Sequence, residues 1–228
     1  MDTSVKKPNL LGFAELHCVS NYSFLFGASH PEELIKQAHL LGYEAIALTD
    51  QCTYSGLVKA HIAAKTYGIK LIVGAEFCVD FSAVLEESTG KPGQHNVLKE
   101  YEVKIVLLAT DRDTYGQLSA LITKLRRRSK KGQYTAEPED FRWGLKGCLA
   151  LWIPSNHHTL RTLKAVGQAL KALFPELWIA LELFRDGHDL DKTAKALTLS
   201  MRLNLPLVAS NDVHTHVPQR QPLQDVLT

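Results

Sequence analysis

The sequence predicts an α/β fold in which seven strands alternate with helices in a parallel barrel or sheet. Seven apolar runs recur along the 228 residues, and most are separated by a single segment with helical spacing. Five of the runs end at an acid or at a cluster of acids and histidines. In barrel enzymes the strand tips converge at one end while the interior stays packed. The polar endings are therefore expected to meet.

The polar endings carry residue types that bind metal ions. They are Glu15 with His17, then Asp50, Glu76, Glu182, and finally Asp212 with His214. Carboxylates and imidazoles are the ligands of zinc and manganese in proteins. The pattern resembles a metal site built at the ends of strands.

Helical segments fill the intervals between the runs. The first follows Ser29-His30-Pro31-Glu32, which predicts a capping box with Ser29 as the cap, and Gly42 ends it. Apolar residues at helical spacing predict four more helices, over residues 57–67, 115–125, 160–173 and 190–201. The strands expected around them cover residues 12–16, 44–49, 70–75, 103–109, 148–153, 178–183 and 205–209.

The chain is expected to form a single domain over residues 1–228. Residues 81–100 hold the turn cluster Thr89-Gly90-Lys91-Pro92-Gly93 between polar flanks, which predicts a protruding loop or hairpin. Residues 222–227 resemble the first turns of an amphipathic helix cut at Thr228. That ending suggests a fragment of a longer polypeptide.

Composition sets broad limits. The chain is 45% hydrophobic and has 26 basic and 24 acidic residues, a balance that does not by itself demand a nucleic-acid partner. The sequence has no apolar stretch of the ~20 residues needed to cross a bilayer, and residues 1–9 lack the apolar core of a signal peptide. The four cysteines are scattered without a CxxC pair. We expect a cytoplasmic protein without disulfides.

Several ordered motifs resemble a known family. They are residues 14–18 (AELHC), 20–25 (SNYSFL), 27–34 (GASHPEEL), 48–50 (LTD), 74–77 (GAEF) and 211–214 (NDVH). In this order they resemble the PHP (polymerase and histidinol phosphatase) domain. Residues 16–18 (LHC), 181–183 (LEL), 212–217 (DVHTHV) and 220–225 (RQPLQD) are similar, more narrowly, to the N-terminal region of bacterial error-prone DNA polymerases. These are C-family enzymes, like the DNA polymerase III alpha subunit, of the SOS mutagenesis type.

The resemblance implies a distorted seven-stranded TIM-like (β/α)7 barrel. Active PHP domains hold a metal cluster and hydrolyse phosphoesters, whereas in the polymerases the domain precedes the palm. The palm, with its magnesium ions, would lie beyond Thr228 and is absent here. The resemblance further implies a parent that performs damage-induced translesion DNA synthesis. Its partners would be the rest of the polymerase chain, DNA, the sliding clamp and accessory mutagenesis proteins, with no membrane.

The family's metal ligands are only partly kept. The resemblance places retained ligands at His17, Glu76, Asp212 and His214, with Asp50 adjacent. The positions where a ligand is lost are Val19, Phe26, Gln51, Lys104 and Pro154. The ammonium of Lys104 has no lone pair and repels a cation. No residue stands out as catalytic.

Three interpretations of this remnant stay open. Four ligands suit one zinc or manganese ion but not a multinuclear cluster, which needs bridging and terminal ligands for every ion. Alternatively, Lys104 neutralises the surviving carboxylates and the remnant is a salt-bridged structural plug, which is the favoured interpretation. The third is an active site, in which case the protein is a free-standing, metal-dependent phosphoesterase that acts on a phosphate monoester or a nucleic-acid end. For the protein as a whole, a binding domain without chemistry is a further alternative to the polymerase.

A basic run follows the third expected helix. Arg126, Arg127, Arg128, Lys130 and Lys131 are suited to contact phosphates. A basic helix end also suits the helix dipole and water, and the run carries no aromatic platform for base stacking. The solvated helix end is the favoured interpretation.

Overall fold

The structure is a computed structural model that describes residues 12–83, 86, 102–142 and 145–227. The chain folds as two compact units, one formed by Met1–Gly74 with Asp212–Thr228 and the other by Ala75–Asn211. They are called the first and the second unit below. The first unit is thus discontinuous in sequence.

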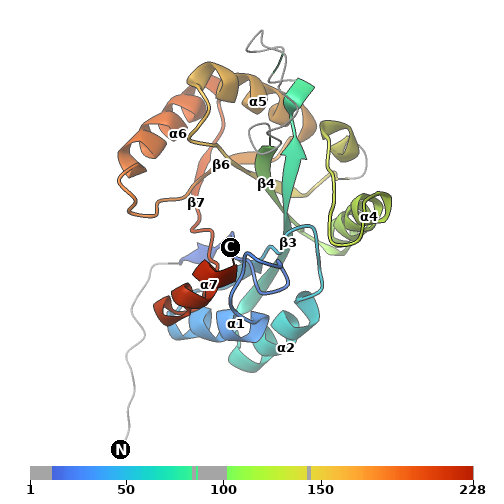
Figure 1. Cartoon of the computed structure of the whole chain (residues 1–228), viewed down its shortest axis with the longest axis vertical. Coiled ribbons are helices and arrows are strands. Elements are labelled where there is room, and N and C mark those ends of the chain that lie inside the picture. Colours follow the sequence, from blue (N-terminus) through green and yellow to red (C-terminus); the bar gives the residue numbers. More distant parts are fainter. Residues whose placement is uncertain (1–11, 84–85, 87–101, 143–144, 228) are drawn as a thin grey trace, which may run out of the picture. The chain divides into compact units, whose positions relative to one another are not determined.

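Within the described residues, the strands form one sheet in the order of the sequence, from β1 to β7. They are β1 (Ala14–Glu15), β2 (Ala45–Leu48), β3 (Lys70–Asp80), β4 (Glu102–Leu108), β5 (Leu149–Ile153), β6 (Leu177–Leu181) and β7 (Leu207–Ala209). Helices lie between most of them (Figure 1). The predicted α/β class with seven strands is confirmed.

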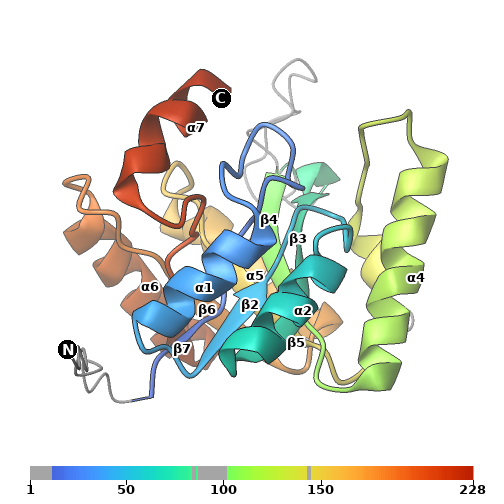
Figure 2. The ribbon, with the colours of Figure 1, turned by 90° about the horizontal axis from the view of Figure 1, so that it is seen from below.

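In the first unit, β1 and β2 pair in parallel, and β2 pairs in parallel with the beginning of β3, where Ala45 lies opposite Lys70. Helices α1 (Pro31–Leu40) and α2 (Leu57–Tyr67) pack against each other (Figure 2). Each of these elements buries side chains in the core of the unit. Examples are Ile35 of α1, Ile46 of β2 and Ala60 of α2. These small and branched side chains allow both helices to approach the strands closely.

Helix α1 begins one residue later than the sequence predicted. Its N-cap is His30, whose backbone N–H donates to Oε2 of Glu33 at 2.9 Å. Ser29 is buried instead, and its Oγ lies 2.7 Å from Nδ1 of His216. The prediction of Ser29 as the cap was therefore wrong, because a contact with a distant part of the chain occupies its hydroxyl.

The second unit departs from the expected parallel arrangement. Strand β4 pairs antiparallel with β5, and Leu108 lies opposite Leu149. Helix α4 (Arg112–Arg128) follows β4, and β5 starts beside the end of β4. Thr110 Oγ1 donates to the Gly147 carbonyl at 2.8 Å and joins these two ends. The remaining pairs, β5–β6 and β6–β7, are parallel as expected.

Two helices, α5 (Leu160–Leu173) and α6 (Asp189–Leu203), pack together over these strands (Figure 1). Three aromatic rings meet in the core of the second unit. The Phe141 ring, in the short helix η2 (Pro138–Phe141), makes edge contacts with Phe77 at 5.7 Å and Phe174 at 5.9 Å between centroids. Each edge contact adds about 0.5–1.5 kcal/mol to the hydrophobic burial.

The end of the chain belongs to the first unit and forms η3 (Pro218–Arg220) and α7 (Gln221–Leu227). The expected protruding loop over residues 81–100 lies mostly outside the described residues, since β3 ends at Asp80. Of the helices that the structure describes, none combines the length and the apolar character needed to cross a membrane.

Candidate functional site

Three predicted ligands gather in the first unit around one carboxylate oxygen. Nε2 of His17 lies 3.5 Å from Oδ1 of Asp212, and Nε2 of His214 lies 2.9 Å from the same oxygen. His17 is fully buried, and the side chains of Asp212 and His214 are 13% and 23% exposed. Two imidazoles and one carboxylate thus face a common point with limited access to water.

A short parallel bridge brings these residues together. Val213 N–H donates to the His17 carbonyl, and Val19 N–H donates to the Val213 carbonyl, each at 2.9 Å. Asp212 has a φ of 48°, in the left-handed region that Asp tolerates better than most residues. The sequence motif around residue 212 therefore specifies a backbone turn as well as two candidate ligands, Asp212 and His214.

Sequence reasoning missed one contact of this site. Nε2 of Gln224, in α7, lies 2.6 Å from Nδ1 of His214. An amide nitrogen only donates, so Nδ1 is the acceptor and the Nε2–H of His214 faces Asp212. The motif RQPLQD contained Gln224, but its spacing gave no sign that α7 folds back to the histidine.

Asp50 lies in the same unit but has other partners. Its Oδ1 accepts from Ser20 N–H and Ser23 Oγ, both at 2.7 Å, and its Oδ2 accepts from Ser20 Oγ at 2.8 Å. Burial raises the pKa of this carboxyl, and the serine hydrogen bonds oppose that shift. Asp50 therefore anchors the loop that follows β1.

Two further polar residues near the end of β1 have local roles. Oε1 of the buried Glu15 accepts from the backbone N–H groups of Leu16 and His17, at 3.1 and 3.0 Å. Burial raises the pKa of the Cys18 thiol well above its usual range, and the negative charges of Glu15, Asp50 and Asp212 add to this shift. Cys18 is a neutral core residue beside His17.

The positions of the first unit at which the resemblance implies a lost ligand have different surroundings. Val19 is buried, and Gln51 donates its backbone N–H to Ser23 Oγ at 2.9 Å. Phe26 is 45% exposed and, like Phe24, which is 79% exposed, belongs to the loop between β1 and α1. Apolar side chains thus stand at two positions where the resemblance implies ligands.

The second unit contains Glu76 and two lost positions. Nζ of Lys104, in β4, lies 3.2 Å from Oε2 of Glu76, in β3. The Glu76 side chain is 7% exposed and that of Lys104 is 33% exposed. Pro154 directly follows β5. Glu182 is also buried here, and its Oε1 accepts from Ser210 Oγ at 3.0 Å. The ion pair expected from the sequence is present.

A scan of protein families matches residues 15–182 with the model described as "PHP domain". The chain belongs to the PHP domain family. It is also 46% identical to an error-prone DNA polymerase of Methylococcus capsulatus and 44% identical to one of Dechloromonas aromatica, over 95% of this chain in each case. It spans only 18% and 19% of the length of those two relatives.

Solved structures support the PHP fold. An amidohydrolase from Chromobacterium violaceum, solved with bound sulfate and no metal, aligns with a TM-score of 0.66 at 18% identity and covers 89% of this chain and 87% of its own. A putative metal-dependent phosphoesterase from Bifidobacterium adolescentis aligns with a TM-score of 0.58 at 15% identity, covering 90% and 88%. At these identities the likeness concerns the fold alone.

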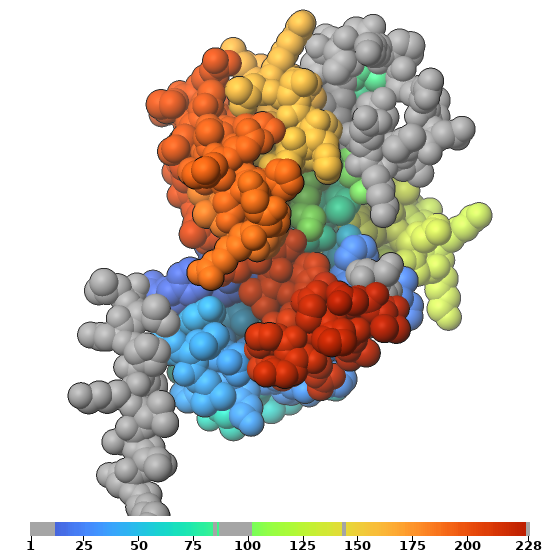
Figure 3. All heavy atoms as spheres, turned by 60° about the vertical axis from the view of Figure 1, so that its left-hand side comes forward, coloured from blue at the N-terminus to red at the C-terminus, as the bar shows by residue number. Residues whose placement is uncertain are grey.

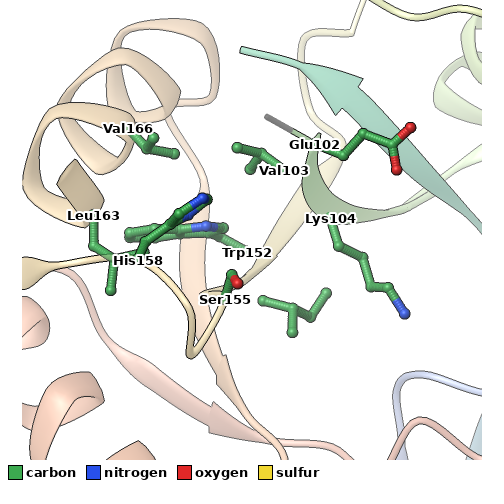
Figure 4. Close-up of a pocket in the computed structure, with 9 residues that line it drawn as sticks. Glu102, Val103, Lys104, Trp152, Ser155, His158, Leu163 and Val166 are labelled. Atoms are coloured by element: carbon green, nitrogen blue, oxygen red, sulfur yellow. The ribbon is translucent and has the colours of Figure 1, made fainter. Parts of the chain in front are cut away.

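The stem of Lys104 also borders a pocket of the PHP domain's second unit. The pocket has a volume of about 170 Å³ and is lined mainly by β4, β5 and α5, including Trp152 and His158. Figure 4 shows the Lys104 side chain extending away from Trp152 and His158. The ammonium therefore serves Glu76 rather than this pocket.

The basic run of the PHP domain is partly used by its own fold. Arg128 donates to both carboxylate oxygens of Asp140, with 2.7 Å between Nη1 and Oδ1, and to the Thr135 carbonyl at 2.6 Å. Arg126 stacks over the Tyr134 ring at 5.1 Å. Arg127, Lys130 and Lys131 are exposed. Two of the five predicted phosphate contacts thus have structural partners.

Proposed function

We propose that this chain is the PHP region of an error-prone DNA polymerase that carries out damage-induced translesion DNA synthesis, and that it is a structural and docking domain there. The support is the 44–46% identity to error-prone DNA polymerases, maintained over 95% of the chain. The chain spans about a fifth of those relatives, so polymerisation belongs to residues outside this sequence.

The single observation that carries the structural role is the ion pair between Lys104 and Glu76. At 3.2 Å an ammonium neutralises a buried carboxylate that the resemblance marks as a ligand. Asp50 supports the same conclusion, because three hydrogen bonds from two serines already use both of its oxygens. The resemblance implies that four further ligand positions, Val19, Phe26, Gln51 and Pro154, are lost as well.

The residues that remain fit one divalent ion and not a cluster. His17, Asp212 and His214 would hold a zinc or manganese ion, since two imidazoles and a carboxylate face one point. Such an ion polarises a phosphoryl oxygen and lowers the pKa of its bound water. In this domain Gln224 orients the His214 ring and the Nε2–H of His214 donates a hydrogen bond to Asp212, so this nitrogen would have to lose its proton to hold an ion.

The partners follow from the same proposal. They are the rest of the polymerase chain, DNA, the sliding clamp and accessory mutagenesis proteins, in the cytoplasm during the SOS response. Magnesium serves only the palm. Arg127, Lys130 and Lys131 are the residues of the basic run best suited to reach a DNA phosphate, because they are exposed.

Measuring how much metal the protein binds tests the proposal that the site is degenerate. The chain is dialysed against zinc or manganese, freed of unbound ions and measured by elemental analysis, and phosphate release is followed from p-nitrophenyl phosphate and from DNA with a terminal phosphate. We expect at most one equivalent of metal and no release above background. The Lys104→His variant, which restores a nitrogen ligand, is expected to hold more zinc than the wild type, with Lys104→Gln as the matched control.

A second function is favoured by the cluster of His17, Asp212 and His214. If the chain is a stand-alone phosphoesterase, it binds two or more equivalents of metal and releases phosphate, and Asp212→Ala abolishes that activity. Such a result would reject the degenerate site.

The polymerase role has a separate test. Damage-induced mutation frequency is measured in cells whose only error-prone polymerase carries this region. We expect His214→Ala to leave that frequency within about twofold of the wild type, because the region acts through its fold. Deletion of the region is expected to abolish damage-induced mutation. A reading frame that ends at Thr228 would contradict the proposal.

A further inference from the structure

Helix α6 of the second unit exposes apolar side chains on its outer face. Leu190 is 88% exposed, Met201 is 77% exposed and Leu197 is 48% exposed, and the exposed Ala194 lies between them in sequence. We call these four residues the outer stripe. Figure 3 shows α6, in orange, at the surface that faces the viewer.

The spacing of the outer stripe is that of a helix–helix contact. Its members stand at positions i, i+4, i+7 and i+11, which place them within about 60° of one another around the helix axis. The side chains that bury α6 are Ala196, Leu199 and Leu203, on the opposite face. The helix thus has two apolar faces, and its own unit buries only one of them.

Polar residues border the outer stripe on both sides. On one side Lys195 pairs with Asp191 at 2.8 Å. On the other side the hydroxyls of Thr193 and Ser200 donate to the carbonyls of Asp189 and Leu205, each at 2.7 Å. A narrow apolar seam between small polar and oppositely charged residues matches the width of one helix. A membrane surface would favour a basic border instead.

A further apolar side chain is exposed in the loop before α6. Phe184 is 49% exposed, and Nζ of Lys192 lies 4.5 Å from its ring centroid. The backbone N–H of Phe184 donates to Oδ1 of Asp189 at 3.2 Å, and this bond fixes the loop against the first turn of α6. The aromatic ring is therefore held in place beside the helix rather than hanging free.

We propose that the outer stripe of α6 docks an amphipathic helix of the polymerase region that follows this domain. The inference rests on the proposed function. Exposed apolar side chains that line one helix face, in place of being scattered singly, are typical of an interaction site. The chain covers only 18–20% of the error-prone polymerases to which it is similar, so most of such a polypeptide is available to cover the stripe.

Hydrogen exchange tests the docking. Amide exchange of residues 189–203 is followed in the 228-residue chain and in the full-length polymerase, with residues 160–173 of α5 as the internal control. We expect the α6 amides to exchange at least about tenfold more slowly in the full-length protein, because docking adds to the free energy of local opening. The α5 amides are expected to change much less.

A double variant makes the test specific. Leu190→Gln with Met201→Gln is expected to leave the thermal midpoint of the isolated chain unchanged and to remove the added α6 protection in the polymerase. The matched control is Val58→Gln with Ile62→Gln, which changes two comparably exposed apolar residues of α2, 71% and 61% exposed. That control is expected to retain the protection.

Two results would overturn the inference. One is equal α6 exchange in the isolated chain and in a full-length polymerase that is active. The other is a dimer of the isolated chain in sedimentation that the α6 double variant abolishes, because the occupant is then a second copy. Failure of the proposed function gives a different result from failure of the docking, because the full-length protein then shows no polymerase activity.

Discussion

The ammonium of Lys104 and the carboxylate of Glu76 form an ion pair with 3.2 Å between Nζ and Oε2. One strand thus supplies a positive charge to a carboxylate that the neighbouring strand buries. In a PHP domain with a complete metal cluster the resemblance implies a histidine in place of Lys104. Here the protein itself provides the neutralising charge.

Removing that charge is expected to destabilise the domain. Lys104→Met leaves the buried Glu76 carboxylate without this cation and lowers the free energy of unfolding by about 1–3 kcal/mol. Urea denaturation at neutral pH measures the change. Lys164→Met, at an exposed position of α5, is the control and is expected to stay within about 0.5 kcal/mol of the wild type. Equal stability of both variants would show that the pair does not hold the fold.

The loop after β1 depends on Asp50. Asp50→Asn replaces an acceptor by an amide nitrogen that cannot accept from Ser20 and Ser23, and we expect a loss of about 2–4 kcal/mol. Ser23→Ala removes one of these bonds and is expected to cost about 1 kcal/mol. Denaturant unfolding measures the free energy of unfolding of both variants, and a smaller loss for Asp50→Asn than for Ser23→Ala would contradict the prediction.

Gly27 gives a steric test of the same loop. A Cβ at this residue would lie 2.1 Å from the Ser20 carbonyl oxygen, so Gly27→Ala forces the backbone apart and is expected to cost about 3 kcal/mol or more. Gly116, inside α4, has open space around its Cβ position, and Gly116→Ala is expected to stabilise by about 0.5–1 kcal/mol. Thermal unfolding of the two variants should therefore shift in opposite directions.

The thiols are expected to be unreactive in the folded protein. Burial raises the pKa of Cys78 to about 12 and that of Cys148 to about 11, and it raises the pKa of Cys18 as well, while Cys52 is fully buried. Titration with a chromogenic disulfide at about pH 8 should detect almost no thiol in the native state and all four after denaturation. Rapid reaction of one thiol in the native chain would contradict this.

Acid is expected to weaken the end of α4 through Asp140. Burial opposes its ionisation, but hydrogen bonds from Arg128, from the Glu137 backbone and from Lys124 outweigh it, so the pKa is lowered. Because the folded pKa is below the unfolded one, this stabilisation is present above about pH 4 and is lost as the pH falls through the folded value. The difference in thermal midpoint between wild type and Asp140→Asn should therefore narrow between about pH 7 and about pH 3. A constant difference would count against the argument.

The features that the sequence predicted are local ones. Short apolar runs with polar ends revealed the strands, and the motifs around residues 17 and 212 located His17, Asp212 and His214. The reversed pairing of β4 with β5 was not predictable, because it depends on the path of residues 129–148. The same holds for Ser29, whose partner His216 lies 187 residues along the chain. Gln224 was missed for another reason, because its contact with His214, ten positions earlier in the chain, depends on how α7 folds back.

The contacts of residues 212–228 with the beginning of the chain have a consequence for biosynthesis. Ser29 pairs with His216, and Glu33 with Arg220, across 187 residues of sequence. On the ribosome, Ala75–Asn211 is synthesised in full while the first unit still lacks its last segment. Formation of the His17–Asp212–His214 cluster must then await the synthesis of residues 212–214 and a large loop closure, so we expect this cluster to form later than contacts between neighbouring elements.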